Sequence, residues 1–491
     1  VTSVSVAIDT EADRIAISPD IYGVNFEEIA PENVSGMTEY PVVRWGGNSV
    51  TRYNWKLNVQ NHASDWFYMN LPKDNSEGET LPDGSRSDRF IDETLGNGGK
   101  VLLQVPTIGW TPKSREVTTG FSVAKYGPQQ LTECSYGGWW CNPDAGNGIR
   151  PDGSLITGND PRDTSVEVGP EFVAEWIEHI QDRVPDQVHY YALDNEPSLW
   201  PYTHRDVHPQ MTTYDEIWDY SKAYGEAIKE ADPKGQIFGP VSWGWCDYFY
   251  SAADGCSAGA DSAAHGGKPF LEWYLSQAEA YRNETSVRLI DYLDIHYYPT
   301  ESGVAISEDE SKGTAARRLK SLKALYDPTF KDASSWIGEP VNLIPRMKDI
   351  IERNAPGTKL AITEYNFGNG RGISSGLAQA EALAIFGREG VDLATRWGQP
   401  LENTPIEDAF KLYLNYDGKG SRINGDSVRA TSSNADMVGS YAISGADGEL
   451  YVLLFNKDTA PKEVSVSIAG RGATQGEVYR FDADDRLKRE G

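Results

Sequence analysis

The sequence has few cysteines, few basic residues relative to acidic ones and no long apolar run, and the last two features argue against nucleic-acid-binding and membrane-spanning proteins. Four of its 491 residues are cysteines, and 45 Lys and Arg stand against 73 Asp and Glu, which gives a net charge of −28. Nucleic acids and anionic membrane surfaces select basic faces, so neither is an expected partner. No uninterrupted apolar run approaches the roughly 20 residues that span a bilayer. A neutral partner fits this composition best.

The four cysteines fall into two local pairs, Cys134 with Cys141 and Cys246 with Cys256. Neither pair has a Cys-x-x-Cys spacing or a histidine at ligand spacing, which favours two local disulfides over a zinc site. Disulfides indicate an exported protein, and the absence of an initiator Met or a leader pattern is typical of a mature or trimmed soluble chain. Four free thiols and the other two connectivities remain alternatives.

Eight short apolar segments alternate with helical patterns in the first 400 residues. One such helical pattern is 170–184, with apolar residues on one face and Pro170 in the first turn. Strands separated by helices form parallel sheets, and eight such units predict an α/β fold closed into a (β/α)8 TIM barrel. The expected strands are 21–26, 41–45, 100–105, 189–193, 236–241, 289–296, 359–363 and 393–397.

After about residue 398 the pattern changes to short alternating runs separated by turn sequences. These runs, at 411–416, 436–443, 449–456, 463–469 and 477–481, predict a small β-sandwich. Residues 4–17 alternate in the same way, so we expect both chain ends to build this domain. The predicted organisation is N-terminal strands of the sandwich at 1–19, the barrel at 20–400 and the C-terminal sandwich at 401–491.

Two of the predicted barrel strands lead directly to a glutamate. Residues 190–193 are followed by Asp-Asn-Glu-Pro, which contains Glu196, and residues 360–363 are followed by Glu364. Side chains at the carboxyl ends of barrel strands face a common pocket. Two carboxyl groups there can hydrolyse a glycosidic bond. Glu196 ends the fourth predicted strand and Glu364 the seventh, and a distance of about 5 Å between their carboxyl groups would favour the retaining mechanism. The alternative is that either glutamate is a helix cap or a rim salt-bridge partner.

Several motifs in the same order resemble glycoside hydrolase family 44. They are Val-Arg-Trp-Gly-Gly-Asn at 43–48, Ser-Asp-Trp at 64–66, Asn-Glu-Pro at 195–197, Asp-Ile-His-Tyr-Tyr-Pro at 294–299 and Ile-Thr-Glu-Tyr-Asn at 362–366. The resemblance runs from near Val4 to the C-terminus. It implies an endo-β-1,4-glucanase or xyloglucanase, with Glu196 as acid/base and Glu364 as nucleophile. It also implies calcium near Asp160 and Asp163, but Lys56 stands where a further acidic ligand is expected, so the metal site is left as unknown.

Polar residues at the same strand ends are candidates for substrate binding. Asn195 is placed to hydrogen-bond a sugar 2-hydroxyl, and Arg44 to orient Glu364 and keep it ionised. His296 and Tyr298 are expected to hydrogen-bond on the side of Glu364. A barrel-floor ion pair for Arg44 and a core position for His296 are the structural alternatives.

Aromatic residues are abundant, at 11% of the chain with 14 Trp and 26 Tyr. Flat rings suit sugar faces, although most of them must belong to the core. Trp397 is a candidate floor for the sugar at the cleavage point, and Trp66 and Trp336 are candidates to extend the groove. Ordinary packing is the alternative for each.

These observations predict a secreted, monomeric, retaining glycoside hydrolase that cleaves β-1,4-glucan backbones internally. Cellulose derivatives, xyloglucan, lichenan and xylan are the expected substrates, and catalysis needs no cofactor. One alternative is a xylanase or arabinofuranosidase of the same clan, since the two glutamates do not distinguish them. Another is a non-catalytic glycan-binding protein, against which the presence of both carboxylates argues.

Overall fold

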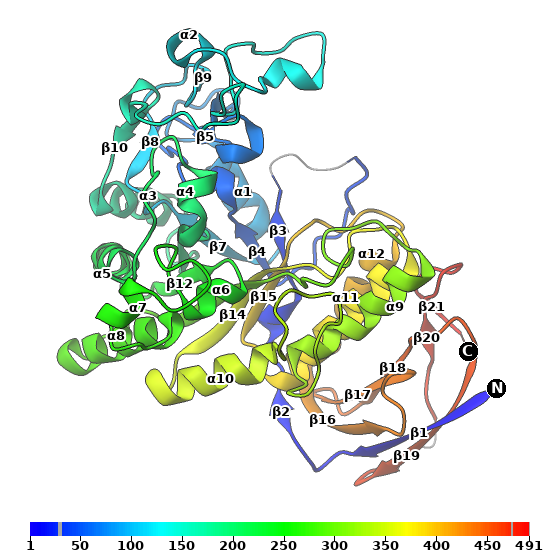
Figure 1. Cartoon of the computed structure of the whole chain (residues 1–491). Helices are drawn as coiled ribbons and strands as arrows, with labels where there is room; N and C mark the ends of the chain where they lie inside the picture. Colours follow the sequence, from blue (N-terminus) through cyan, green and yellow to red (C-terminus); the bar gives the residue numbers. More distant parts are fainter. Residues whose placement is uncertain (28–31, 473–474, 491) are drawn as a thin grey trace. The chain divides into compact units, whose positions relative to one another are not determined.

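A computed structural model describes residues 1–27, 32–472 and 475–490 (Figure 1). The chain forms two compact units. One consists of Val1–Val42, Tyr297–Ile350 and Lys359–Gly491, and the other of Val43–His296 and Ile351–Thr358. None of the helices in the described ranges combines the length and the apolar character needed to cross a membrane.

Eight strands form the closed parallel barrel that the sequence predicts. Strands β13 and β14 are buried along almost their whole length, because both faces of a parallel barrel sheet are covered. The barrel strands are β3 (Gly23–Phe26), β4 (Val42–Trp45), β7 (Lys100–Val105), β11 (Tyr190–Leu193), β12 (Gln236–Ser242), β13 (Tyr292–Tyr297), β14 (Lys359–Tyr365) and β15 (Leu393–Arg396).

The predicted helices lie between these strands. Helix α3 (Pro170–Arg183) has Pro170 in its first turn, and the Thr213 side chain accepts a hydrogen bond from the Glu216 N–H at the start of α5 (Tyr214–Ala231). The remaining helices are α1 (Arg86–Gly96), α2 (Val123–Tyr126), α4 (Trp200–Thr203), α6 (Trp245–Phe249), α7 (Ala260–Ala264), α8 (Phe270–Thr285), α9 (Lys312–Ser321), α10 (Leu343–Asn354) and α11 (Ile373–Glu389).

The long insertions after β4 and β7 contain small sheets of their own. Strands β5 (Val59–Asn61), β6 (Met69–Pro72) and β9 (Thr118–Thr119) form one, and β8 (Trp110–Pro112) pairs with β10 (Ser165–Glu167) in another. Both predicted disulfides form, between Cys134 and Cys141 and between Cys246 and Cys256.

The two chain ends share one mostly antiparallel sheet, as predicted. Strand β1 (Thr2–Asp9) pairs antiparallel with β16 (Gly425–Ser432) and parallel with β19 (Lys462–Ala469). The sheet order is β18-β17-β16-β1-β19, with β17 at Val438–Gly445, β18 at Leu450–Asn456 and β2 (Ile15–Ala16) beside β16. Alternate residues of β1 are buried, and its Val6 and Ile8 form a core with Val428 and Ala442. Strands β20 (Tyr479–Arg480) and β21 (Lys488–Arg489) form a separate pair.

One predicted strand is wrong. Residues 411–416 were expected to be extended, but helix α12 (Pro405–Leu414) covers most of them. Thr404 caps this helix by accepting a hydrogen bond from the Glu407 N–H at 3.3 Å, and Phe410 and Leu414 follow Ile406 at intervals of four. Residues 411–416 overlap the end of this helix, and over only six residues its apolar positions resemble the alternation of a strand. Strand β16 was missed because its sequence is mostly polar and only two of its eight residues are buried.

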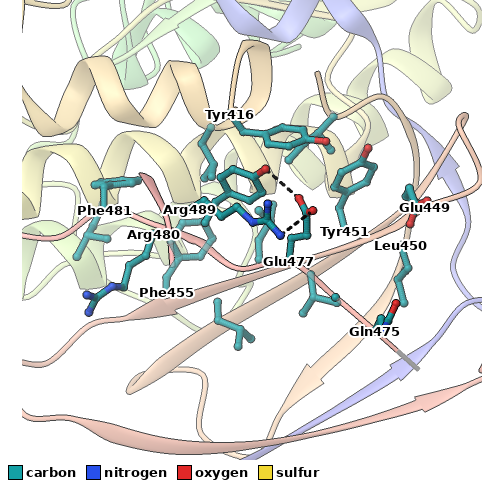
Figure 2. A pocket seen from close by; sticks show the side chains of 18 residues that line it. Tyr416, Glu449, Leu450, Tyr451, Phe455, Gln475, Glu477, Arg480, Phe481 and Arg489 are labelled. Carbon is teal, nitrogen blue, oxygen red and sulfur yellow. Dashed lines mark hydrogen bonds and ion pairs between the residues drawn. The ribbon is translucent and has the colours of Figure 1, made fainter. Parts of the chain in front are cut away.

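A cavity of about 940 Å³ lies in the unit that contains the C-terminal sheet (Figure 2). The Tyr416 ring contacts the rings of Tyr451 and Tyr479 edge to face, with centroids 6.0 and 4.9 Å apart. Glu477 forms an ion pair with Arg489 at 3.0 Å and accepts a hydrogen bond from the Tyr479 hydroxyl at 3.0 Å. The charges of Glu477 and Arg489 neutralise each other, and none of the candidate site residues from the sequence lines this cavity.

Candidate active site

The turn after β11 carries Glu196 in an unusual backbone conformation. Asp194 and Glu196 have φ values of 64° and 45°, in the left-handed region that residues with side chains seldom adopt. The Asp194 carboxylate accepts hydrogen bonds from the backbone N–H groups of Thr107 at 2.7 Å and Ile108 at 3.1 Å. The Glu196 N–H donates to the Val241 carbonyl at 3.0 Å. These bonds fix the position of Glu196 at the carboxyl end of the strand.

Glu196 lies in surroundings that keep it protonated. Its Oε1 is 2.8 Å from Nδ1 of the fully buried His296, and only 14% of its side chain is exposed. Burial raises the pKa of Glu196 to about 7; the positive charge of Arg44 opposes this rise and the negative charge of Asp65 adds to it. A carboxyl group with this pKa holds a transferable proton near neutral pH, as a general acid requires. The contact between His296 and Glu196 was not part of the sequence prediction, which assigned His296 to the side of Glu364.

A chain of hydrogen bonds passes through Asn195, the residue before Glu196. Arg44 Nη2 donates to Asn195 Oδ1 at 2.7 Å, and Asn195 Nδ2 donates to Asn48 Oδ1 at 3.1 Å. Asn48 Nδ2 in turn donates to Asp65 Oδ2 at 2.9 Å. The amide of Asn195 therefore links β4 through Asn48 to Asp65. Arg44 and Asp65, at the two ends of this chain, carry the charges that affect the pKa of Glu196. Binding of a sugar hydroxyl by Asn195 stays a prediction.

Asp247 is a buried acid that sequence reasoning missed. Its carboxylate accepts hydrogen bonds from Ser198 Oγ at 2.6 Å and from the Trp243 N–H at 3.2 Å. Burial raises the pKa of Asp247 to about 7, and the nearby charge of Glu196 adds to the rise. The sequence signal that could have identified Asp247 is an acidic residue in the aromatic run Trp-Gly-Trp-Cys-Asp-Tyr-Phe, directly after a barrel strand.

Glu364 lies in the other compact unit, near the end of β14. Its side chain is buried, and the Tyr298 hydroxyl donates a hydrogen bond to its Oε1 at 2.7 Å. Asn25 on β3 donates through Nδ2 to the carbonyls of Thr363 at 2.8 Å and Thr395 at 3.2 Å. Glu364 is thus held by the regular strand itself and does not depend on a strained turn.

The three candidate tryptophans lie in different settings. Trp397 directly follows β15, is half-buried, and its backbone N–H donates at 3.1 Å to the carbonyl of Tyr365, the residue after Glu364. Trp66 is half-buried at the end of a short 3-10 helix, Ala63–Trp66. Trp336 is 58% exposed, in a loop whose Ser335 hydrogen-bonds Thr300, two residues after Tyr298.

The loop expected to bind calcium does not present a free set of carboxylates. Asp163 is occupied by the ammonium group of Lys125, and Asp160 accepts from the Arg162 N–H at 2.9 Å within its own turn. Lys56 pairs with Glu175. A calcium ion needs several oxygen ligands that are not already neutralised by cations, so these residues do not fit the ion.

Comparison with known proteins decides the family. Residues 59–301 match the model of Glycoside hydrolase family 44. Over 98% of its length the chain is 30% identical to Endoglucanase A of Paenibacillus lautus, and it covers 68% of that protein. The chain belongs to glycoside hydrolase family 44. It is also 30% identical to Beta-mannanase/endoglucanase A of Caldicellulosiruptor saccharolyticus, of which it spans only about a third, 36%.

Solved structures agree with this assignment. A bifunctional glucanase-xylanase from a metagenome library is 36% identical to this family 44 chain with a TM-score of 0.93, covering 100% of this chain and 95% of that one. A Paenibacillus polymyxa xyloglucanase of the same family is 27% identical with a TM-score of 0.82 and the same coverage. The protein is therefore a glycoside hydrolase, and its barrel and separate sheet domain have the architecture of these family members.

Proposed function

We propose that this family 44 enzyme cleaves β-1,4-glucan backbones internally and with retention of configuration, with Glu196 as acid/base and Glu364 as nucleophile. The observation that carries the two-glutamate assignment is the placement of Glu196 just after β11 and of Glu364 near the end of β14, each with a hydrogen-bonding partner at its carboxyl group. The burial that raises the pKa of Glu196 to about 7 agrees with it. Strands β11 and β14 are parallel members of one closed barrel, and the carboxyl ends of such strands share a rim. This topology supports the joint action of Glu196 and Glu364.

In the first step, Glu196 donates its proton to the glycosidic oxygen while a Glu364 oxygen attacks the anomeric carbon. The bond between that carbon and the glycosidic oxygen breaks, one sugar segment leaves with a new hydroxyl group, and the other stays esterified to Glu364. In the second step Glu196, now a carboxylate, takes a proton from water, whose oxygen attacks the anomeric carbon and releases Glu364. Two inversions give net retention, and no cofactor takes part.

The neighbours of each glutamate suit these roles. His296 fixes the direction of the Glu196 carboxyl through a 2.8 Å contact, and Asp65 helps to keep that group protonated before the first step. The Tyr298 hydroxyl, 2.7 Å from Glu364, stabilises a carboxylate at the position from which it attacks. Trp397 and Trp66 are proposed to bind sugar rings by stacking, and Trp336 to do so farther along the groove.

The names of the relatives support a β-linked polysaccharide as substrate. They include an endoglucanase, a xyloglucanase, a glucanase-xylanase and a mannanase/endoglucanase. We propose plain and xylose-branched β-1,4-glucans as the principal substrates, with lichenan and xylan as further ones. The two disulfides support action outside the cell, and we propose that the enzyme acts as a monomer.

The test is a parallel assay of carboxymethyl-cellulose, xyloglucan, lichenan, xylan and mannan. For an endo-acting glucanase, viscosity falls early while few reducing ends appear, and oligosaccharides of mixed length accumulate. Glu364→Gln serves as the inactive control for contaminating activity. Release of single sugars without loss of viscosity would instead indicate an exo-acting enzyme such as an arabinofuranosidase.

A further inference from the structure

The disulfide-closed loop between Cys134 and Cys141 exposes three large aromatic side chains. Trp139 is 96% exposed, Trp140 is 65% exposed and Tyr136 is 67% exposed. Within the described part of the chain, neither indole has a ring contact or a side-chain hydrogen bond. Clustered exposed apolar surface of this kind marks a binding site more often than a stable free surface. We call Tyr136, Trp139 and Trp140 the aromatic platform.

The loop that carries the aromatic platform is held in place from within. The disulfide joins its two ends, with Cα atoms 5.0 Å apart. The buried carboxylate of Glu133 accepts a hydrogen bond from the Asn142 N–H at 2.5 Å, and Thr132 forms a backbone bridge with Gly146. Because the backbone is fixed before a ligand arrives, little conformational freedom is lost on binding.

Two glycines shape the turn that presents the indoles. Gly137 and Gly138 have φ values of 78° and 124°. A Cβ atom on Gly138 would lie 3.2 Å from the Trp140 carbonyl oxygen, so a larger residue would disturb the turn. The sequence Cys-Ser-Tyr-Gly-Gly-Trp-Trp-Cys therefore specifies an outward display of tryptophan and contains no charged residue.

One residue of the aromatic platform, Tyr136, contacts the segment that precedes β6 and contains Asp65. The Tyr136 ring lies 5.9 Å from the ring of Trp66 and 5.8 Å from that of Phe67. Trp66 follows Asp65, whose charge contributes to the raised pKa of Glu196. The ring contact between Tyr136 and Trp66 and the charge of Asp65 thus connect the loop of the aromatic platform with the surroundings of Glu196, all within one compact unit.

We propose that the aromatic platform binds a distal segment of the same polysaccharide chain that is cleaved at Glu196. Sugar rings of a β-linked chain present flat C–H faces that pack on indoles, and an uncharged loop fits a neutral ligand. The proposal rests on the proposed function, because it assigns the platform to the substrate of that site. The enzyme would therefore bind long chains more tightly than short ones through contacts remote from the scissile bond.

The experiment compares a polymer with a short substrate in platform variants of the full chain. In Trp139→Ala/Trp140→Ala we expect KM for xyloglucan or carboxymethyl-cellulose to rise about 10- to 100-fold, taking roughly three- to ten-fold for each lost aromatic contact. We expect kcat to change less than two-fold, and an aryl cellobioside too short to reach the platform to be hydrolysed as before.

Matched variants separate stacking from general hydrophobicity. Trp139→Phe/Trp140→Phe keeps flat rings and should retain most of the polymer affinity, whereas Trp139→Leu/Trp140→Leu keeps apolar surface without a flat face and should behave like the alanine variant. An unchanged polymer KM in the alanine variant, or full affinity in the leucine variant, would overturn the proposal. Thermal melting of each variant verifies that it is folded.

Binding without turnover distinguishes failure of the platform from failure of the proposed function. If the unmodified enzyme hydrolyses neither polymer nor short glucoside, the proposed function fails. The platform is then tested by affinity electrophoresis in gels containing xyloglucan, with the Glu364→Gln background. Retardation that disappears in the tryptophan-to-alanine variant supports a glycan platform; equal mobility of both proteins contradicts it and points to another ligand, such as a protein surface.

Discussion

Glu196 and Glu364 follow the same sequence pattern and occupy different local structures. Glu196 lies in a left-handed turn beyond β11, held by a network in which Asp194 accepts backbone hydrogen bonds. Glu364 belongs to β14, where Tyr298 donates to its carboxylate. Glu196 thus follows a turn in the left-handed region and contacts His296, whereas Glu364 belongs to a regular strand and accepts a hydrogen bond from Tyr298.

This difference fits the two roles that we propose for the glutamates. Burial with Asp65 nearby favours the neutral form of Glu196 and raises its pKa to about 7, which suits proton donation. At Glu364, the hydrogen bond donated by the Tyr298 hydroxyl holds one carboxylate oxygen in a fixed position, which suits the proposed attack on carbon.

Removal of the Glu364 carboxylate, the proposed nucleophile, has the largest expected effect. Glu364→Ala should lower kcat/KM by more than about 10⁴-fold on polymers and on aryl glycosides with activated leaving groups alike, because every substrate needs the covalent step. Steady-state assays with both substrate types measure this. Glu352→Ala, on the exposed side of α10, is the control and should retain full activity. Substantial activity of Glu364→Ala on the activated glycoside would place the nucleophile elsewhere.

The loss of rate on removing Glu196, the proposed acid/base, should depend on the leaving group. Glu196→Ala is expected to lose about 10²- to 10⁴-fold on the polymer, the range for general acid catalysis, but far less in forming the glycosyl-enzyme from a dinitrophenyl glycoside. Pre-steady-state bursts of dinitrophenol measure this step. Equal losses on both substrates would assign Glu196 a role other than proton donation.

Loss of the Tyr298 hydroxyl, the partner of Glu364, should lower the rate less than loss of either glutamate. Tyr298→Phe removes one hydrogen bond to a charged group, worth about 1.5–3 kcal/mol, so kcat should fall roughly 10- to 100-fold with little change in KM. Tyr202→Phe changes an exposed tyrosine and serves as the control. A change confined to KM would show that Tyr298 binds substrate and does not assist Glu364.

The smallest expected effect is a shift in pH dependence. The acid must be protonated, so kcat/KM should fall as pH rises through the pKa of Glu196, near 7. Asp65→Asn removes a negative charge that raises this pKa, so the alkaline limb should move to lower pH, by less than about one unit. The exposed Asp152→Asn is the control. A limb that stays in place, or moves to higher pH, would contradict the electrostatic role of Asp65.

Strong local patterns made much of the fold predictable. The bounds of β7 match the predicted 100–105, and α3 covers all but the last residue of the helix predicted at 170–184. The same approach placed Glu196 and Glu364 at strand ends, because an apolar run followed by a polar cluster marks the end of a buried strand. Local cysteine spacing likewise gave both disulfides.

Features that depend on distant contacts were not predictable in this way. The polar strand β16 is recognisable only by its pairing with β1 and β17. The contact of His296 with Glu196 joins residues 100 positions apart, and no local pattern specifies which glutamate a histidine meets. The exposure of Trp139 is also a tertiary property, because tryptophan composition alone favours burial.

The most direct test of the two roles is the configuration of the glycosyl azide formed by each glutamate variant. With an activated aryl β-glycoside and azide, Glu196→Ala should give the β-azide, because the glycosyl-enzyme forms on Glu364 and azide then inverts it a second time. Glu364→Ala should give at most the α-azide, by a single inversion. Proton NMR of the anomeric position determines the configuration of both products. A β-azide from Glu364→Ala, or an α-azide from Glu196→Ala, would contradict the assignment.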